Sequence, residues 1–189
     1  MTRAFEPLTP EIWPAFESFF SGQSVTNNCW CMWWRLPAPE IVARNREPLK
    51  RAFRERVFEG PPPGLVVFED GVPIGWVQVT PRADVGRFNK GRVAKPEAGA
   101  DLEKVWAVTC FFVAKTHRRI GLMTELARVA CEFAAEAGAQ AVEAAALKPK
   151  DKLQWSDGFV GIVPALVRAG FREAEERSAA RVLMRWEPS

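Results

Sequence analysis

A short basic turn in the second half of the chain carries residue types that bind phosphate. Arg118, Arg119 and Gly121 lie between an apolar stretch, 105–113, and a helical pattern that starts near Leu122. The first N–H groups of a helix have no partner inside it, and the helix dipole favours negative charge beside them. The glycine lets the backbone approach phosphate oxygens, and the arginines can pair with them. A diphosphate fits such a place, although a solvated strand-to-helix turn is the alternative, since short motifs also occur by chance.

The elements that position this turn follow from hydrophobic periodicity and from turn residues. In the first half we expect a strand at 3–8, a helix from an N-cap at Thr9 to Gly22, helical structure at 39–59 that bends or breaks at Pro48, a hairpin at 65–80 and a long polar connection at 81–103. In the second half we expect a buried strand at 104–113, a helix from 122 to Gly138, a strand at 139–147, a helix at 159–169 and strands at 171–175 and 179–186. This order predicts an α/β fold with a mixed sheet.

Composition limits the classes of protein to which the chain can belong. Its 189 residues, 48% of them hydrophobic, suit one domain with a substantial core, and we assign 1–189 to it. The net charge of +3 is too small to indicate a nucleic-acid binder, but it suits a protein that handles an anionic cofactor. No apolar run reaches the roughly 18 residues that span a bilayer, and 1–10 lacks a signal-peptide core. We therefore expect a cytoplasmic protein without membrane contact, with its four cysteines reduced.

With these elements in place, the chain resembles the GNAT acetyltransferase superfamily. Arg118-Arg119-Ile120-Gly121 is similar to its acyl-CoA-binding motif, Arg/Gln-x-x-Gly-x-Gly/Ala, which stands between its fourth strand and third helix. The preceding Phe111-Phe112-Val113, the helical 126–130 and the later stretch from Gly158 to Phe171 resemble the segments that surround that motif. Met123 departs from the small final residue of the motif, and a Cys-Trp-Cys-Met-x-Trp-Arg stretch resembles a subgroup. The implied fold is a mixed, mostly antiparallel twisted sheet of about six to seven strands flanked by about four helices.

The resemblance implies a binding mode for acetyl-CoA. Backbone amides from Arg119 to Thr124 would hold the diphosphate, and the edge of the strand at 110–113 would pair with the pantetheine arm. A backbone N–H near Phe112 or Val113 would stabilise the oxyanion. The implied cofactor-binding residues are Phe111, Phe112, Val113, Arg118, Arg119, Ile120, Gly121, Leu122, Met123 and Thr124.

The acid and the base are less defined, because relatives often use a tyrosine as the acid and this chain has none. Phe159 stands roughly where that tyrosine is expected, so Ser156 or a water would replace it. Glu103, with Asp101 and Glu143 as alternatives, could serve as a base through water, and each could equally be a surface carboxylate. The catalytic candidates are Glu103, Ser156 and Cys110.

An aromatic and sulfur-rich segment falls where the family places its substrate-covering region. Tryptophan faces there could hold a cationic amine, or the same side chains could fill the core. The acceptor-binding candidates are Cys29, Trp30, Trp34, Arg35, Trp76 and Gln78. A zinc site from Cys29, Cys31, Cys110 and His117 is conceivable, but the Cys-x-Cys spacing is tighter than in zinc knuckles, so we expect no metal. The basic residues of 81–103 suit a solvated loop or one that closes over a ligand.

These observations favour an acyl-CoA-dependent N-acyltransferase that moves an acetyl group to the amine of a small molecule by direct attack. A GNAT-like module that binds CoA or another ligand with little catalysis is the alternative, since tyrosine is missing and Met123 departs from the motif. GNAT relatives are often dimers, so a homodimer is one expectation.

Overall fold

Seven strands form one twisted sheet in the computed structural model, which describes residues 2–42, 46–149 and 157–188. The strands are β1 (Arg3–Pro7), β2 (Gly64–Glu69), β3 (Val72–Pro81), β4 (Val105–Val113), β5 (Ala141–Leu147), β6 (Arg172–Glu176) and β7 (Arg181–Trp186). Their order in the sheet is β1-β2-β3-β4-β5-β7-β6. All neighbours are antiparallel except β4 and β5, which run parallel. The expected α/β fold with a mixed, mostly antiparallel sheet is confirmed.

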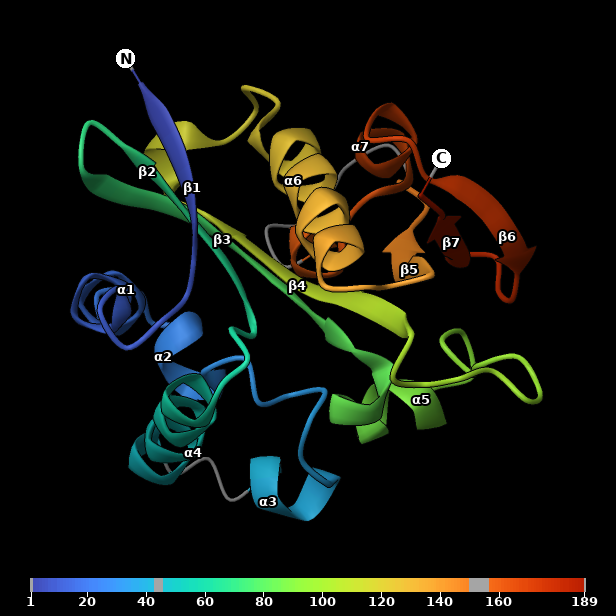
Figure 1. Cartoon of the computed structure of the whole chain (residues 1–189), viewed down its shortest axis with the longest axis horizontal. Helices are drawn as coiled ribbons and strands as arrows, with labels where there is room; N and C mark the ends of the chain where they lie inside the picture. Colours follow the sequence, from blue (N-terminus) through green and yellow to red (C-terminus); the bar gives the residue numbers. More distant parts are fainter. Residues whose placement is uncertain (1, 43–45, 150–156, 189) are drawn as a thin grey trace.

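Helices cover both faces of the sheet, with α6 and α7 on one face and α1 to α5 on the other (Figure 1). They are α1 (Trp13–Ser21), α2 (Thr26–Cys29), α3 (Ala38–Val42), α4 (Arg46–Glu59), α5 (Gly86–Lys90), α6 (Leu122–Glu136) and α7 (Val163–Arg168). Three short 3-10 turns are η1 (Arg82–Asp84), η2 (Lys115–His117) and η3 (Asp157–Val160). The described residues thus form seven α-helices where about four were expected, because elements as short as α2 and α5 show no readable periodicity.

Two helix boundaries differ from the sequence prediction. Helix α1 begins at Trp13 after Ile12 and not after an N-cap at Thr9, although the Thr9 carbonyl accepts the Trp13 amide at 3.0 Å. The helix expected at 159–169 is divided into η3 and α7. Gly161, with φ of 81°, lies between them, and that left-handed backbone conformation interrupts a right-handed helix.

The segment 81–103 is not the long polar connection that its charges suggested. It contains η1 and α5, and it buries Val85, Phe88 and Ala94, which pack against Ala107 of β4 and Ala145 of β5. Their burial holds the segment on the sheet, because each apolar side chain removed from water contributes roughly 1–3 kcal/mol. The prediction was wrong since only three apolar positions, spaced irregularly among basic residues, carry the packing.

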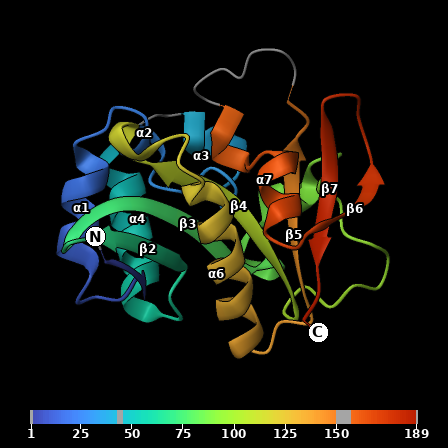
Figure 2. The same ribbon diagram turned by 90° about the horizontal axis from the view of Figure 1, so that it is seen from above.

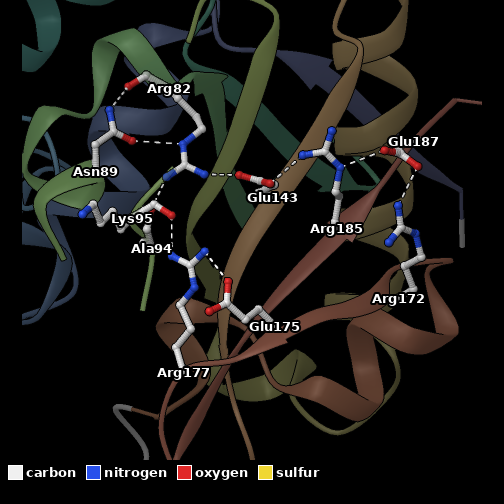
Figure 3. A network of polar contacts seen from close by, with 10 residues as sticks. All are labelled: Arg82, Asn89, Ala94, Lys95, Glu143, Arg172, Glu175, Arg177, Arg185 and Glu187. Atoms are coloured by element: carbon white, nitrogen blue, oxygen red, sulfur yellow. Dashed lines mark hydrogen bonds and ion pairs between the residues drawn. The ribbon is translucent and has the colours of Figure 1, made fainter. Parts of the chain in front are cut away.

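A chain of buried and half-buried ion pairs fastens this segment to the sheet (Figure 3). The guanidinium of Arg82 contacts the Glu143 carboxylate and also donates to the Ala94 carbonyl. The other oxygen of Glu143 accepts from Arg185 at 2.7 Å. Arg82 is therefore not a solvated basic residue, and Glu143 is not a surface carboxylate, since their side chains are 0% and 4% exposed. Burial lowers the pKa of Arg82, while the nearby Glu143 carboxylate opposes that shift.

Strand β4 is buried on both faces, as expected, and it carries a bulge. Val79 pairs with Val108 and Gln78 pairs with Cys110, so Thr109 is an extra residue on β4. The bulge changes the alternation of side chains, and both Val108 and Phe111 pack in the cluster beneath α6.

The parallel pairing of β4 with β5 is short. It covers only Val105–Ala107 against Ala141–Glu143, and beyond these residues the two strands diverge (Figure 2). The 3-10 turn η3 and helix α7 follow β5 and lie beside this gap, where Leu147 bridges to Ile162. Beyond Ala107, this edge of β4 therefore pairs with no strand of the described residues. Among the described helices, none combines the length and apolar character that a membrane crossing requires.

Candidate functional site

The turn after β4 has the geometry that its sequence indicated. Arg119 and Gly121 both have positive φ values, 67° and 87°, and Gly121 directly precedes the first residue of α6. A left-handed φ favours glycine, so the requirement at position 121 comes from the backbone conformation. A Cβ added to Gly121 would meet no atom within 4 Å, which shows open space beside it.

The amides of this turn point to no acceptor within the part of the chain that the structure describes. The amides of residues 119–123 have no backbone or side-chain partner there, whereas the Thr124 amide donates to the Gly121 carbonyl at 2.9 Å. Free N–H groups at the start of a helix attract anions. The expected set of amides therefore ends at Met123 and excludes Thr124, whose hydroxyl donates to the Ala165 carbonyl at 3.2 Å.

A cavity of about 460 Å³ opens in front of these amides. Its walls come from the end of β4, the turn, the start of α6, η3 and α7. The cations His117 (when protonated), Arg118, Arg119 and Arg168 line it, so its charge favours an anion. The side chain of Met123 reaches towards Gly158 and forms part of the wall.

Phe159 lines the same cavity, and its ring stacks on Phe112 at 6.4 Å between centroids. At the place where relatives are expected to hold a tyrosine, the wall is therefore aromatic and without a hydroxyl.

Three ion pairs hold the turn against the other end of the sheet. Glu69 of β2 contacts His117 Nε2 at 3.0 Å and Arg3 Nε at 3.0 Å, and Arg3 also binds Glu125 of α6 at 2.8 Å. These hydrogen bonds, first that from Arg3 and then that from His117, hold the pKa of Glu69 below its usual value. The network fixes the turn and α6 relative to β1 and β2.

The edge of β4 towards the gap carries backbone groups of alternate residues. The Ala114 amide donates to the Ile74 carbonyl of β3, so by alternation the Phe112 amide also faces β3. Phe111 and Val113 then face the gap, and Arg118 Nε donates to the Val113 carbonyl at 3.1 Å. The expected oxyanion donor at Phe112 is thus oriented away from the cavity, whereas Val113 remains suitable.

A second, smaller cavity of about 200 Å³ lies on the opposite face of the sheet, beside α5. Thr109 at the β4 bulge, Ala145 of β5 and Val160 of η3 line it, together with Trp34 and Phe88. Phe111 and Phe159 line the larger cavity. Thr109, two residues before Phe111, and Val160, which follows Phe159, line the smaller one. The two cavities therefore flank the same stretch of β4 from opposite faces.

The residues expected to bind the acceptor divide into two groups. Trp30 and Trp76 are fully buried among α1, α4 and β3 and line neither cavity, so the core interpretation holds for both. Trp34 lines the small cavity, and Gln78 donates to the Thr109 hydroxyl there at 2.6 Å. Arg35 follows Trp34 and is buried beside Asp84, with 3.4 Å between Nη1 and Oδ2.

Cys29, Cys31 and Cys110 lie close together near Trp76, whose indole N–H donates to the Cys31 sulfur at 3.1 Å. Burial raises the pKa of the Cys29 thiol to about 12, and the nearby Cys110 adds to the shift. Burial also raises the pKa of Cys31 well above its usual value. His117 is bonded to Glu69 instead of these thiols, and the described residues contain no group arranged to hold a metal ion.

Of the three catalytic candidates, the structure describes Glu103 and Cys110 and does not bring these two together. Glu103 is exposed just before β4, at the end of the strand opposite to the turn, and a strand of 9 residues spans about 30 Å. Glu103 therefore lies far from the turn and from the larger cavity beside it. Cys110 lines neither cavity. Ser156 lies outside the described residues.

Several wall residues were not identified from the sequence. They are Phe88, Ala94, Thr109, Val160, Arg168 and Arg181. Residues 81–103 did contain a signal, since the apolar Val85, Phe88 and Ala94 interrupt its charged positions. No local sequence pattern indicated that Arg181 lines a cavity, because its position depends on the pairing of β7 with β5.

The sequence matches one protein-family model, and the fold resembles those of several solved structures. Residues 28–153 match the model of the acetyltransferase (GNAT) family. The GNAT domain of S. lividans PAT superposes with a TM-score of 0.57 at 16% identity, covering 100% of this chain and 92% of that one. AAC(6')-Ib in complex with paromomycin and acetyl-CoA gives a TM-score of 0.57 at 14% identity, covering 99% and 94%.

PaiA N-acetyltransferase from Thermoplasma acidophilum, in complex with coenzyme A, gives a TM-score of 0.53 at 12% identity and covers 100% of both chains. No curated protein matches the sequence. At these identities the solved structures establish the shared fold.

Proposed function

Because the chain belongs to the acetyltransferase (GNAT) family, we propose that it transfers an acetyl group from acetyl-CoA to the amine of a small molecule. The observation that carries the proposal is the row of free amides at residues 119–123, which faces a cavity with four basic lining residues. Helix-start amides and cations together suit a diphosphate. The known complexes of PaiA with coenzyme A and of AAC(6')-Ib with acetyl-CoA add support.

In this proposal, each part of the larger cavity has a role in binding. The amides of residues 119–123 hold the diphosphate, and Arg119 and Arg168 supply further positive charge. The gap-facing edge of β4 pairs with the amide groups of the pantetheine arm, as an added strand would. For that pairing Arg118 releases the Val113 carbonyl and turns to the phosphates.

The chemistry requires the amine and the thioester to meet beside the β4 bulge. The acceptor enters from the smaller cavity on the other face, and its nitrogen attacks the thioester carbon directly. A new C–N bond forms, the C–S bond breaks, and coenzyme A leaves with its sulfur as a thiolate that takes up the proton released by the amine. The Val113 N–H stabilises the oxyanion, and holding both reactants in place supplies much of the acceleration.

Thermal unfolding with and without acetyl-CoA tests the binding part of this proposal. A ligand at a hundredfold excess over its Kd stabilises by about 2.7 kcal/mol, or roughly 5–10 °C for a chain of this length. The Gly121→Glu variant places an acid among the free amides and should abolish this shift.

A matched control is available because Gly138 has φ of 88°, close to the 87° of Gly121, and equally open surroundings. Gly138→Glu should lower the basal Tm by a similar amount and retain the full shift with acetyl-CoA. No shift in the unmodified protein at millimolar acetyl-CoA would overturn the proposal.

A CoA-binding module with little catalysis is the competing function, and the aromatic Phe159 in the cavity wall favours it. Release of the coenzyme A thiol, measured over a panel of amines, decides between the two. Turnover above the rate of spontaneous hydrolysis excludes the binding-only function, and saturable binding without any turnover supports it.

A further inference from the structure

The smaller cavity is apolar and of limited size. Its wall contains the rings of Trp34 and Phe88 and the aliphatic side chains of Ala145 and Val160. Its volume of about 200 Å³ is below the roughly 300–1,000 Å³ of sites for drug-sized ligands. It accommodates a compact apolar group such as the side chain of a large amino acid.

The charged residues that line this cavity are both arginines. Arg181 on β7 is half-buried, with Nη1 3.3 Å from the Ala145 carbonyl, and Arg92 is exposed at the other wall. A guanidinium has five N–H donors, and the Arg181 side chain makes one hydrogen bond among the described residues, so donors remain for a ligand. The cavity wall therefore carries positively charged side chains that can contact a bound ligand.

The carboxylates near this cavity are already shared between cations. Asp84 contacts both Arg35, whose side chain is 7% exposed, and Arg56. Of the guanidinium of Arg35, Nε and Nη2 are buried without a partner among the described residues. One carboxylate facing two guanidiniums leaves a positive surplus, which extends over the neighbouring Trp34.

Glu143, on the strand that carries Ala145, is likewise shared between two guanidiniums, those of Arg82 and Arg185. Asp84 and Glu143 are thus each paired with two cations.

We propose that the acceptor is an amino acid with an apolar side chain, whose carboxylate pairs with Arg181 while its side chain fills the cavity lined by Trp34 and Phe88. This inference rests on the proposed acetyl transfer and names the substrate class of that reaction. The two arginines of the smaller cavity complement the negative charge of a carboxylate. AAC(6')-Ib, by contrast, has been solved with paromomycin, ribostamycin or kanamycin. Such polycations would be repelled by two lining arginines.

Binding of product-like probes tests the inference without requiring turnover. Isothermal titration calorimetry in the presence of coenzyme A compares N-acetyl-L-phenylalanine with N-acetylphenethylamine, which has the same ring and amide but no carboxylate. The carboxylate should improve the Kd about tenfold or more, the value of one charge-assisted contact. Kanamycin at 1 mM, about a typical upper KM, should produce no binding heat.

Substitutions of Arg181 test whether this residue causes the preference for the probe with a carboxylate. Arg181→Gln should reduce the ratio of the two Kd values to near one, and Arg181→Lys should restore part of it because the charge remains. Arg172→Gln is the control, since Arg172 is an exposed arginine on β6 that pairs with Glu187, and it should leave the ratio unchanged.

The outcomes separate the two proposals. Equal Kd values for the probes, no binding of either probe, or preferential binding of kanamycin would overturn the amino-acid acceptor while coenzyme A still binds. Failure of coenzyme A to bind overturns the transferase proposal. The probe titrations, repeated without coenzyme A, then still decide whether the cavity selects a carboxylate.

Discussion

Arg82 and Glu143 form an ion pair in the interior, between the segment that follows β3 and the last residue of β5 that pairs with β4. The Nε of Arg82 also donates to Asn89 Oδ1 at 3.0 Å, and the guanidinium lies 5.3 Å from the centroid of the Phe88 ring. Phe88 and Ala94 line the smaller cavity. The pair therefore connects the stability of the fold with the shape of the smaller cavity.

Removing Arg82 should destabilise the protein strongly. Arg82→Met leaves Glu143 buried with one cation instead of two, and breaking a buried pair costs about 3–5 kcal/mol. Urea unfolding monitored by circular dichroism measures the change in free energy. Arg128→Met is the control, because Arg128 forms an exposed pair with Glu132, and such a pair contributes at most about 1 kcal/mol. A similar, small loss in both variants would contradict this account.

Arg119→Gly should change stability and acetyl-CoA affinity in opposite directions. A non-glycine residue at φ of 67° is strained by about 1–2 kcal/mol, and glycine removes that strain at an entropic cost of roughly 0.5–1 kcal/mol. The free energy of unfolding should stay equal or rise slightly, while loss of one charge-assisted contact weakens acetyl-CoA binding about tenfold. Arg119→Asn, which tolerates the same φ, should show the same loss of affinity. An unchanged Kd would remove Arg119 from the site.

Stability at low pH should depend on Asp84. Burial alone would raise the pKa of this carboxyl, but the Thr80 hydroxyl and the guanidiniums of Arg56 and Arg35 outweigh it and hold the pKa below its usual value. A depressed pKa in the folded state contributes stability that is present above about pH 4, the value for an unfolded aspartate, and is lost as pH falls through the folded pKa.

Asp84→Asn should therefore destabilise the protein by roughly 1.5–3 kcal/mol at pH 7 and by less at pH 2.5. Unfolding by urea at both pH values measures the two differences. The same loss at both would show that Asp84 acts through packing instead of charge.

The buried thiols should be unreactive in the folded protein. With a pKa of about 12, only about one Cys29 side chain in 10⁴ is a thiolate at pH 8. Alkylation by iodoacetamide, followed by mass spectrometry, should leave Cys29, Cys31 and Cys131 unmodified until urea unfolds the chain. Rapid native labelling of Cys29 would show that its surroundings open, and it would also add a background to any thiol-release assay.

Particular residues show what could be predicted and why. The run of apolar residues at 105–113 and the spacing of Leu122, Leu126 and Ala130 are local patterns, and they identified a buried strand and an amphipathic helix. Gly121 was selected from its place before the expected helix, and the structure gives it a left-handed backbone conformation there. By contrast, the burial of Arg82 depends on Glu143, 61 positions away, and no local pattern joins them.

By itself, the sequence determined the α/β class, the succession of strands and helices along the chain and the glycine-containing turn before α6, because these depend on residues within one or two turns of each other. Tertiary structure alone decided that Trp30 is core while Trp34 lines a cavity, that Glu103 lies far from the turn, and that Arg181 faces Ala145. The physical reason is that burial and charge pairing arise between strands distant in sequence. Their register follows from the packing of the whole sheet.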